Sequence, residues 1–243
     1  MRYQQVRAVV LGSRVFGEAD RIAVLFTREI GRADAIVKGV RRTKSRWGGR
    51  LEPFNVCDLV LYRGRSLFTV TSAQFVASFE RLRTDLDAMA AASVVCEAAA
   101  ALFPEEEPQE RVFNLLCHAL AEIDKGIDGR AAEAPLLAGA LVKLLHEAGY
   151  LPVLDHCVAC GSGHHALAFS ASRGGLICDD CVGEGVPISP EAVDVLCCSV
   201  QQSLAELRSA PSSPAAAEAL RHLHSLYQQQ TGTRLRSLAF ARI

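Results

Sequence analysis

Four cysteines form two pairs with the spacing of a metal site. Cys157 and Cys160 enclose two residues, Cys178 and Cys181 enclose two more, and seventeen residues separate the pairs. Two thiolates at this spacing bind one side of a tetrahedral ion, and a second pair completes the shell. Because sulfur would fill all four coordination positions, no position remains for an activated water. The sequence therefore predicts one structural zinc ion that holds a small module together.

A disulfide framework and a redox pair are the two other interpretations of these cysteines. Disulfides are disfavoured because the total of nine cysteines is odd and no leader peptide is expected at the start. A thioredoxin-like pair would occur once, in a βαβ unit, whereas this chain has two pairs with glycines beside them. The expected location is a reducing cytoplasm. The remaining cysteines have apolar neighbours and are expected to be buried: Cys57, Cys96, Cys117, Cys197 and Cys198.

Three histidines lie close to the cysteine pairs in the sequence. His156, His164 and His165 are each expected to be solvated loop residues, because four cysteines already complete a shell. Replacement of one cysteine ligand by a histidine is the minor alternative.

A second segment of chemical interest is strongly basic. Residues 38–50 hold six cations in thirteen residues, together with one tryptophan and several glycines. Arginine binds phosphate through two parallel hydrogen bonds, lysine adds a mobile charge, and an aromatic ring can stack on any base. The pattern predicts a loop that binds nucleic acid without sequence preference, through Lys38, Arg41, Arg42, Lys44, Arg46, Trp47 and Arg50.

Three residues of this constellation have a second interpretation. Trp47 is the only tryptophan, and a ring that closes the end of a barrel is nearly as plausible as a stacking ring. Arg14 and Arg21 flank the turn Gly17–Asp20 and either extend the basic surface or pair with the carboxylates of that turn.

Charge is distributed unevenly along the 243 residues. Lys and Arg against Asp and Glu give 14 minus 6, or +8, for residues 1–79, and 12 minus 21, or −9, for residues 80–243. Summed positive charge attracts nucleic acid and releases its counterions, so the first part is expected to hold a polyanion. The alternative is that these cations only solvate a surface. No apolar stretch reaches the ~20 residues needed to span a bilayer, so no membrane association is expected.

The elements that must position these residues change type near Phe79. Before it, short runs of Val, Ile, Leu, Phe and Thr alternate with glycine turns, which predicts five strands and a small barrel of the OB-fold type. The expected strands are Val6–Leu11, Arg21–Thr27, Arg32–Val37, Cys57–Tyr62 and Leu67–Thr71.

After Phe79, apolar residues recur at helical spacing. The expected helices run from Leu82 to Phe103, from Val112 to Ile123, from Leu137 to Ala148, from a cap at Ser189 through Leu207, and through Leu220 to Tyr227. Because helix resumes after the cysteines, the module is expected to be an insertion in one helical domain. The fold prediction is therefore a multidomain α+β chain. It has a five-stranded OB-fold barrel at 1–79 and an all-α domain at 80–243, with a zinc-ribbon-like module inserted at about 153–186.

The order and spacing of these features resemble the RecO family of bacterial DNA repair proteins over essentially the whole chain. In the first part the resemblance rests on Gly17-Glu18-Ala-Asp20, Thr27, Gly31, Lys38-Gly39-Val-Arg41-Arg42, Lys44-Ser45-Arg46 and Leu51-Glu-Pro53-Phe54. In the second it rests on Gly149-Tyr150-Leu-Pro152, Cys157, Cys160, Gly161, Phe169, Gly174-Gly175, Cys178 and Cys181.

The resemblance implies a recombination mediator rather than an enzyme. Such a protein binds single- and double-stranded DNA and anneals complementary strands. It contacts the C-terminal tail of single-stranded DNA-binding protein through its helical domain and acts with RecR to promote RecA loading, in the cytoplasm at the nucleoid. An enzyme is disfavoured because the sequence has no phosphate-binding Gly-Lys-Ser/Thr loop, no His-Glu-x-x-His helix and no Gly-x-Ser-x-Gly elbow. The alternative function is a zinc-ribbon transcription or translation factor that binds nucleic acid.

Overall fold

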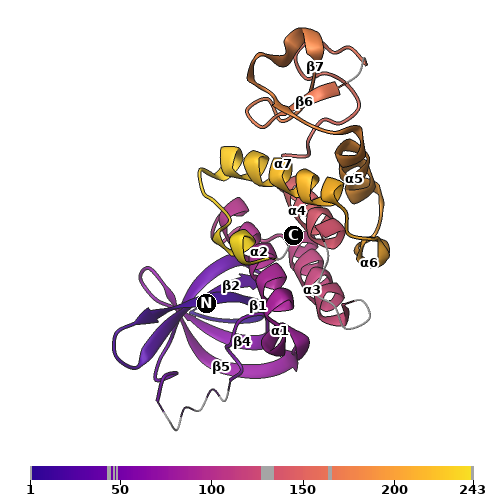
Figure 1. Cartoon of the computed structure of the whole chain (residues 1–243). Coiled ribbons are helices and arrows are strands. Elements are labelled where there is room, and N and C mark those ends of the chain that lie inside the picture. The colour runs from indigo at the N-terminus through magenta and orange to yellow at the C-terminus, as the bar shows by residue number, and fades with distance from the viewer. Residues whose placement is uncertain are drawn as a thin grey trace.

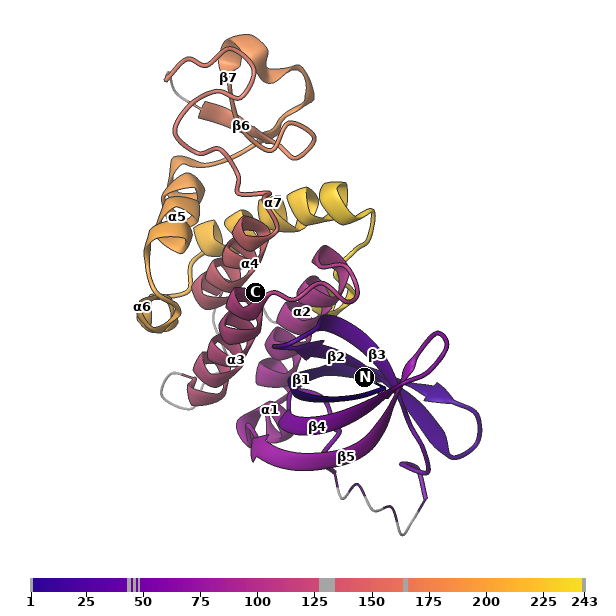
Figure 2. The ribbon, with the colours of Figure 1, turned by 180° about the vertical axis from the view of Figure 1, so that it is seen from behind.

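The computed structural model describes residues 2–42, 45, 47, 49–126, 134–163 and 166–241. It consists of a barrel, a helical body and a small module that carries the four paired cysteines. The barrel and the module lie at opposite ends of the molecule, with the helices between them (Figures 1 and 2).

The N-terminal part is a closed barrel with strand order β1-β2-β3-β5-β4. Its strands are β1 (Tyr3–Phe16), β2 (Asp20–Thr27), β3 (Gly31–Val37), β4 (Val56–Arg63) and β5 (Phe68–Ala77). All neighbours are antiparallel except β3 and β5, which are parallel. The five predicted strands and the barrel are confirmed.

Strand β1 is longer than predicted. The sequence predicts its end at Leu11 because glycine follows, but Gly12 lies at a shift of register against β2, and pairing continues to Phe16 opposite Asp20. A β-bulge of this kind bends a strand without ending it. The hairpin between β1 and β2 therefore projects further than the sequence indicated.

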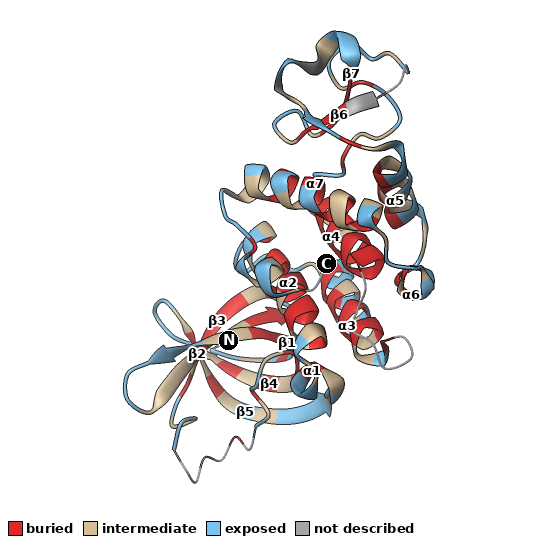
Figure 3. Cartoon of the chain, in the orientation of Figure 1, coloured by how far each residue is buried: buried red, intermediate tan, exposed pale blue. Residues whose placement is uncertain are grey.

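Seven α-helices and a short 3₁₀ helix form the helical body in the described part of the chain. Helix α4 is central and buried along almost its whole length (Figure 3), which explains why its residues are apolar on all sides. No helix among the described residues is long and apolar enough to cross a membrane. The elements are α1 (Arg81–Thr84), α2 (Leu86–Leu102), α3 (Glu110–Lys125), α4 (Ala134–Glu147), α5 (Pro190–Gln201), α6 (Leu204–Ser209), α7 (Pro214–Thr231) and η2 (Arg236–Phe240).

Two helices that the periodicity predicted as continuous are each divided by a cap. Asp85 separates α1 from α2, because its carboxylate accepts hydrogen bonds from the amides of Asp87 and Ala88. Ser203 separates α5 from α6 and forms a capping box with Glu206. Apolar spacing continues through both breaks, so the pattern alone did not reveal them.

One hydrophobic cluster extends from the barrel into the helical body, and the barrel also has a core cluster of its own. Val9, Phe26 and Val56 of the barrel belong to the same buried cluster as residues of α2, α3 and α4. The rings of Phe26 and Phe103 meet edge to face, with centroids 5.8 Å apart. The boundary near residue 79 therefore separates two architectures that one continuous cluster joins.

An acidic turn between α2 and α3, residues 104–110, lies against the barrel. The amide of Glu106 donates to the carbonyl of Arg32 at 2.8 Å. A side chain at Gly31 would bring its Cβ to 1.9 Å from the carbonyl oxygen of Glu107. Three ion pairs join the turn to the barrel: Arg28 with Glu110, Arg32 with Glu105 at 2.9 Å, and Arg63 with Glu106 at 2.7 Å.

Candidate metal centre and nucleic-acid interface

The module is built from short elements between α4 and α5. Strands β6 (Ala166–Ser170), β7 (Gly175–Cys178) and β8 (Val186–Pro187) form a sheet of order β7-β6-β8, and the 3₁₀ helix η1 (Asp179–Glu184) follows β7. Cys157 and Cys160 lie on a turn in which the amide of Gly161 donates to the Cys157 carbonyl at 2.8 Å. Gly161 has a φ of 75°, which favours glycine at this position.

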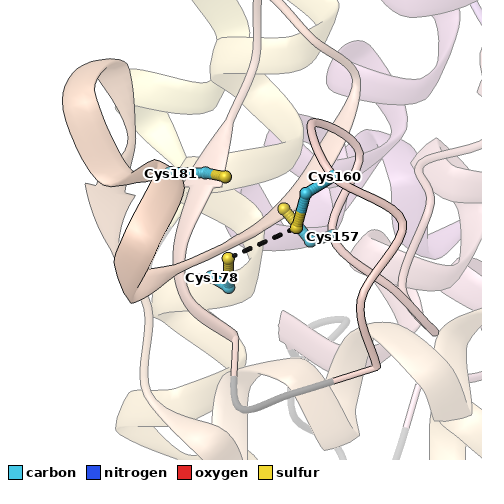
Figure 4. Close-up of side chains that lie close together, drawn as sticks. All are labelled: Cys157, Cys160, Cys178 and Cys181. Atoms are coloured by element: carbon cyan, nitrogen blue, oxygen red, sulfur yellow. Dashed lines mark hydrogen bonds between the residues drawn. The ribbon is translucent and has the colours of Figure 1, made fainter.

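The structure brings the four predicted ligands together. Their Sγ atoms all lie within 4.8 Å of one another, and those of Cys160 and Cys178 are 3.7 Å apart (Figure 4). A tetrahedron with zinc–sulfur bonds of about 2.3 Å has edges of about 3.8 Å, so the spacing fits a four-coordinate ion. Cys157, Cys160, Cys178 and Cys181 could therefore hold a metal ion.

The acid–base properties of the thiols favour a cation at this position. Backbone hydrogen bonds, first that from Cys178, lower the pKa of Cys157 to about 6. The neighbouring thiols Cys178 and Cys160 raise the pKa of Cys181 to about 12. Thiolates packed this closely repel one another, and a bound metal ion would supply the compensating charge.

The nearby histidines have different positions. His156 is half-exposed, and its Nδ1 lies 2.7 Å from a carboxylate oxygen of Asp155, outside the cysteine cluster. This agrees with the expectation of a loop histidine. His164 and His165 lie outside the described residues.

The module has little core of its own and is docked on α7. Its separate buried cluster contains only Cys157, Ile177 and Cys178 among the described residues. On the docked side, the ring of Phe169 lies 5.3 Å from that of His222, centroid to centroid. The hydroxyl of Ser189, at the start of α5, donates to Glu218 of α7 at 2.6 Å.

The basic segment begins at the end of β3 and is attached to the β1–β2 turn. The amide of Gly39 donates to the Asp20 carboxylate at 2.7 Å, and the amide of Arg41 donates to the Ala19 carbonyl at 3.0 Å. The Arg41 guanidinium donates to the carbonyl of Glu18 at 3.1 Å. The turn and the start of the basic segment therefore form one surface.

Five predicted DNA-contacting cations lie on the β1–β2 hairpin or at the start of the basic segment, and we call this surface the basic end of the barrel: Arg14, Arg21, Lys38, Arg41 and Arg42. The sixth, Arg50, lies further along the segment, where its carbonyl accepts from the Asn55 side chain at 3.1 Å. Lys38, Arg41 and Arg42 are exposed. Lys44 and Arg46 lie outside the described residues. The carboxylates that accompany Arg14 and Arg21 are not those of the turn, because Arg14 pairs with Asp34 at 2.8 Å and Arg21 lies 3.8 Å from Glu52.

Trp47 belongs to the interior of the barrel. Only 3% of its surface is exposed, it lies in the barrel core cluster, and its indole N–H donates to the Lys38 carbonyl at 2.8 Å. This position matches the barrel-closing alternative and corrects the expectation of a base-stacking ring. The reason is that the only indole of the domain has more apolar surface to bury than any other side chain nearby.

Two of the five other cysteines are buried as expected, two are partly buried and one is exposed. Cys57 and Cys96 are buried, and burial raises the pKa of Cys57 to about 11 and that of Cys96 to about 12. Cys117 and Cys197 are partly buried, whereas Cys198 is exposed. Cys197 and Cys198 differ because adjacent helix positions face different directions.

Two features of functional interest were missed from the sequence. The acidic turn has the composition of an ordinary loop, and nothing local indicates that it neutralises Arg28, Arg32 and Arg63. The exposed ring of Phe16, at the tip of the β1–β2 hairpin, was missed because the predicted strand ends at Leu11. The pair Val15-Phe16 directly before the Gly17–Asp20 turn was the available signal.

Comparison with known proteins matches the chain along both of its parts. The family models described as recombination protein O N terminal and recombination protein O C terminal match residues 1–79 and 83–239. A protein of Rubrobacter xylanophilus named DNA repair protein RecO is 40% identical over 78% of this chain and 75% of its own length. Proteins of the same name from a Nocardioides species and Cutibacterium acnes are 42% and 39% identical, covering 78% and 74% of this chain and 79% and 75% of their own.

Proposed function

The chain belongs to the RecO family of DNA repair proteins, and from this premise we propose that it is a recombination mediator whose basic end binds single- and double-stranded DNA. In this role it anneals complementary strands and acts with RecR and single-stranded DNA-binding protein to promote RecA loading at the nucleoid, in the cytoplasm. The observation that carries the proposal is the exposed set Lys38, Arg41 and Arg42 on a barrel of this family.

The distribution of ion pairs supports DNA binding at this end of the barrel. Arg28, Arg32 and Arg63 are neutralised by the acidic turn on the side that faces the helical body. Lys38 and Arg42 lie away from that turn and have exposed side chains. Exposed positive charge that the acidic turn does not neutralise is available for phosphate, which every DNA sequence presents in the same way.

Simultaneous replacement of Lys38, Arg41 and Arg42 with alanine tests the DNA site. Affinity should fall alike for random and homopolymeric single strands and for duplexes. The slope of log affinity against log salt should become shallower by roughly 0.7 for each phosphate that the variant no longer binds on a single strand. The matched control replaces Arg221, Arg234 and Arg236, which are exposed on the helical body, and so changes net charge equally. Equal losses in both variants, or none in the first, would place the DNA site elsewhere.

We propose that the metal held by Cys157, Cys160, Cys178 and Cys181 is one structural zinc ion. A four-sulfur shell suits zinc and leaves no open position, so the ion supplies stability and no catalytic step is assigned to it. Residues 153–186 carry one arginine against four carboxylates, 1 minus 4 or −3, and a zinc tetrathiolate would add about −2. This charge disfavours the alternative of a zinc ribbon that binds nucleic acid.

Strand annealing in the presence of single-stranded DNA-binding protein tests the mediator function as a whole. The family resemblance supplies the partner, whose C-terminal tail is proposed to dock on the helical body. The protein should accelerate annealing of complementary strands coated with that protein, and deletion of the coating protein's tail should abolish the acceleration. A transcription or translation factor has no reason to accelerate this reaction, so failure with the intact tail would contradict the proposal.

A further inference from the structure

A protein that binds DNA strands before they pair needs a means of recognising unpaired bases. Cations alone do not supply it, because single strands and duplexes both present phosphates. Stacking of a base on an aromatic ring does supply it, and Trp47 is enclosed in the barrel core. The described aromatic side chains that border the basic end are therefore of interest.

Phe16 is an exposed aromatic ring at the basic end. It lies at the last position of β1, opposite Asp20, with 45% of its surface exposed, and its neighbour Val15 is 62% exposed. Residues two apart on a strand lie on the same face, so Phe16 shares a face with Arg14. The ring therefore stands at the tip of a hairpin whose flanks carry cations.

The hairpin tip is held in place by the basic segment. Arg41 donates hydrogen bonds from its side chain to the carbonyls of Gly17 and Glu18, at 3.5 and 3.1 Å, and from its amide to the carbonyl of Ala19. Gly17 follows Phe16 directly and has a φ of 64°, which ends the strand at that ring. A hairpin backbone held in this way loses less conformational entropy on binding than a mobile one, which favours a preorganised contact.

Charge identifies the kind of partner that fits this tip. Residues 14–21 together with 38–42 contain five cations and two acidic residues, a balance of +3. Arg14 and Arg21 pair with Asp34 and Glu52, and Lys38, Arg41 and Arg42 are exposed beside the tip. An exposed apolar pair in such surroundings suits a ligand that combines flat apolar faces with regular negative charge. A single DNA strand has this chemistry, whereas the bases of a duplex are already stacked on one another.

We propose that Phe16 stacks on an unpaired base of a strand whose phosphates are bound by the basic end, and so distinguishes single-stranded from double-stranded DNA. The inference rests on the proposed function, since it assigns a role within the same DNA site. The cations supply affinity for single- and double-stranded DNA alike, and the ring adds affinity for the single strand. The resulting preference favours strands that are still available for annealing.

Replacement of Phe16 with alanine is the direct test. Binding of a fluorescent oligothymidine and of a duplex of equal length is measured by anisotropy at several salt concentrations. Affinity for the single strand should fall about tenfold, the usual order for loss of one stacked base, while duplex affinity and both salt slopes stay unchanged. Phe75→Ala is the matched control, because Phe75 is 47% exposed on β5 of the same barrel.

Two further variants separate stacking from general packing. Phe16→Leu keeps an apolar side chain without a flat ring and should lose as much single-strand affinity as Phe16→Ala. Phe16→Trp should retain affinity, and its fluorescence should be quenched by oligothymidine but not by the duplex. Melting temperatures of all variants provide the check on folding.

Failure of this inference can be distinguished from failure of the proposed function. Unchanged single-strand affinity in Phe16→Ala, or an equal loss on the duplex, overturns the role of the ring. If at the same time the Lys38, Arg41 and Arg42 variant loses affinity for both DNA forms, the proposed DNA site stands without it. If the cation variant also binds normally, the site itself is wrong.

Discussion

Trp47 shows at the level of one residue how burial decides between two roles. Its indole fills the barrel core and donates to a backbone carbonyl, so it contributes to stability. We expect Trp47→Ala to lower the free energy of unfolding by about 3–5 kcal/mol, the range for loss of a buried large ring. Urea unfolding followed by circular dichroism measures this. Phe16→Ala, at an exposed position, should change the free energy of unfolding by less than about 0.5 kcal/mol. Equal effects of the two substitutions would contradict the assignment of Trp47 to the barrel core.

His222 is a second residue whose environment has a measurable consequence. Burial lowers its pKa, with a smaller opposing effect of Glu218 and a further lowering by Arg221. Because the folded pKa lies below the unfolded value of about 6.5, the unfolded chain binds the proton more tightly. The contribution of His222 to the free energy of unfolding is therefore fully present above about pH 6.5 and is lost as the pH falls through the folded pKa.

The prediction is that His222→Gln makes stability less dependent on pH in this window. Urea unfolding of both proteins at about pH 7.5 and about pH 5.5 gives the comparison, since the glutamine cannot take up a proton. Glu218 remains ionised there, because the Ser189 hydroxyl holds its pKa below the usual value. The control is His118→Gln, at an exposed position of α3. An unchanged pH dependence in His222→Gln would show that this docking contact does not titrate.

At the scale of elements, we expect the cysteine module to depend on a bound metal more than on its own core. Replacing both Cys157 and Cys178 with serine should reduce bound zinc from about one per chain to none and leave residues 153–186 without fixed structure, because few apolar side chains remain to order them. Elemental analysis and amide hydrogen exchange measure the two effects, and the barrel should stay protected. Cys198→Ser, outside the cluster, is the control. Retained metal in the double variant would reject the ligand set.

The close contact between the start of β3 and the acidic turn predicts that a side chain at Gly31 destabilises the protein. Gly31→Ala places a Cβ at 1.9 Å from a carbonyl oxygen and strains a φ of 73°. Gly232 has a φ of 67° and open space where a Cβ would lie. Gly232→Ala therefore measures the cost of the backbone conformation alone, about 1–2 kcal/mol of stability. We expect Gly31→Ala to destabilise the protein distinctly more than Gly232→Ala in thermal unfolding. Equal shifts would mean that the turn moves away without cost.

Across the whole molecule, opposite charges in the two parts serve two purposes. Arg28, Arg32 and Arg63 attach the barrel to the acidic turn, whereas Lys38, Arg41 and Arg42 are exposed at the basic end, where we propose that DNA binds. Replacing Glu105, Glu106 and Glu110 with glutamine should release three arginines. DNA affinity should then rise and its salt slope steepen, while stability falls only modestly because exposed ion pairs contribute about 0–1 kcal/mol each. An unchanged slope would show that these arginines cannot reach DNA.

The sequence by itself determined what depends on neighbours along the chain. Strand alternation and turn glycines predicted the barrel, helical spacing predicted the body, and the two Cys-x-x-Cys pairs predicted a metal centre. These signals are local, because a strand, a helix turn and a chelating pair are each specified within a few residues. The basic segment was recognisable for the same reason.

Only the tertiary structure decided which side chains are available. Trp47 and Phe16 are both aromatic residues near basic positions, and the chain folds one into the core and leaves the other outside. Arg32 and Arg42 are alike in sequence, but Arg32 pairs with Glu105, seventy-three residues away, whereas Arg42 is exposed at the basic end. Burial and ion pairing depend on segments that are distant in sequence and are brought together by packing, so no local pattern encodes them.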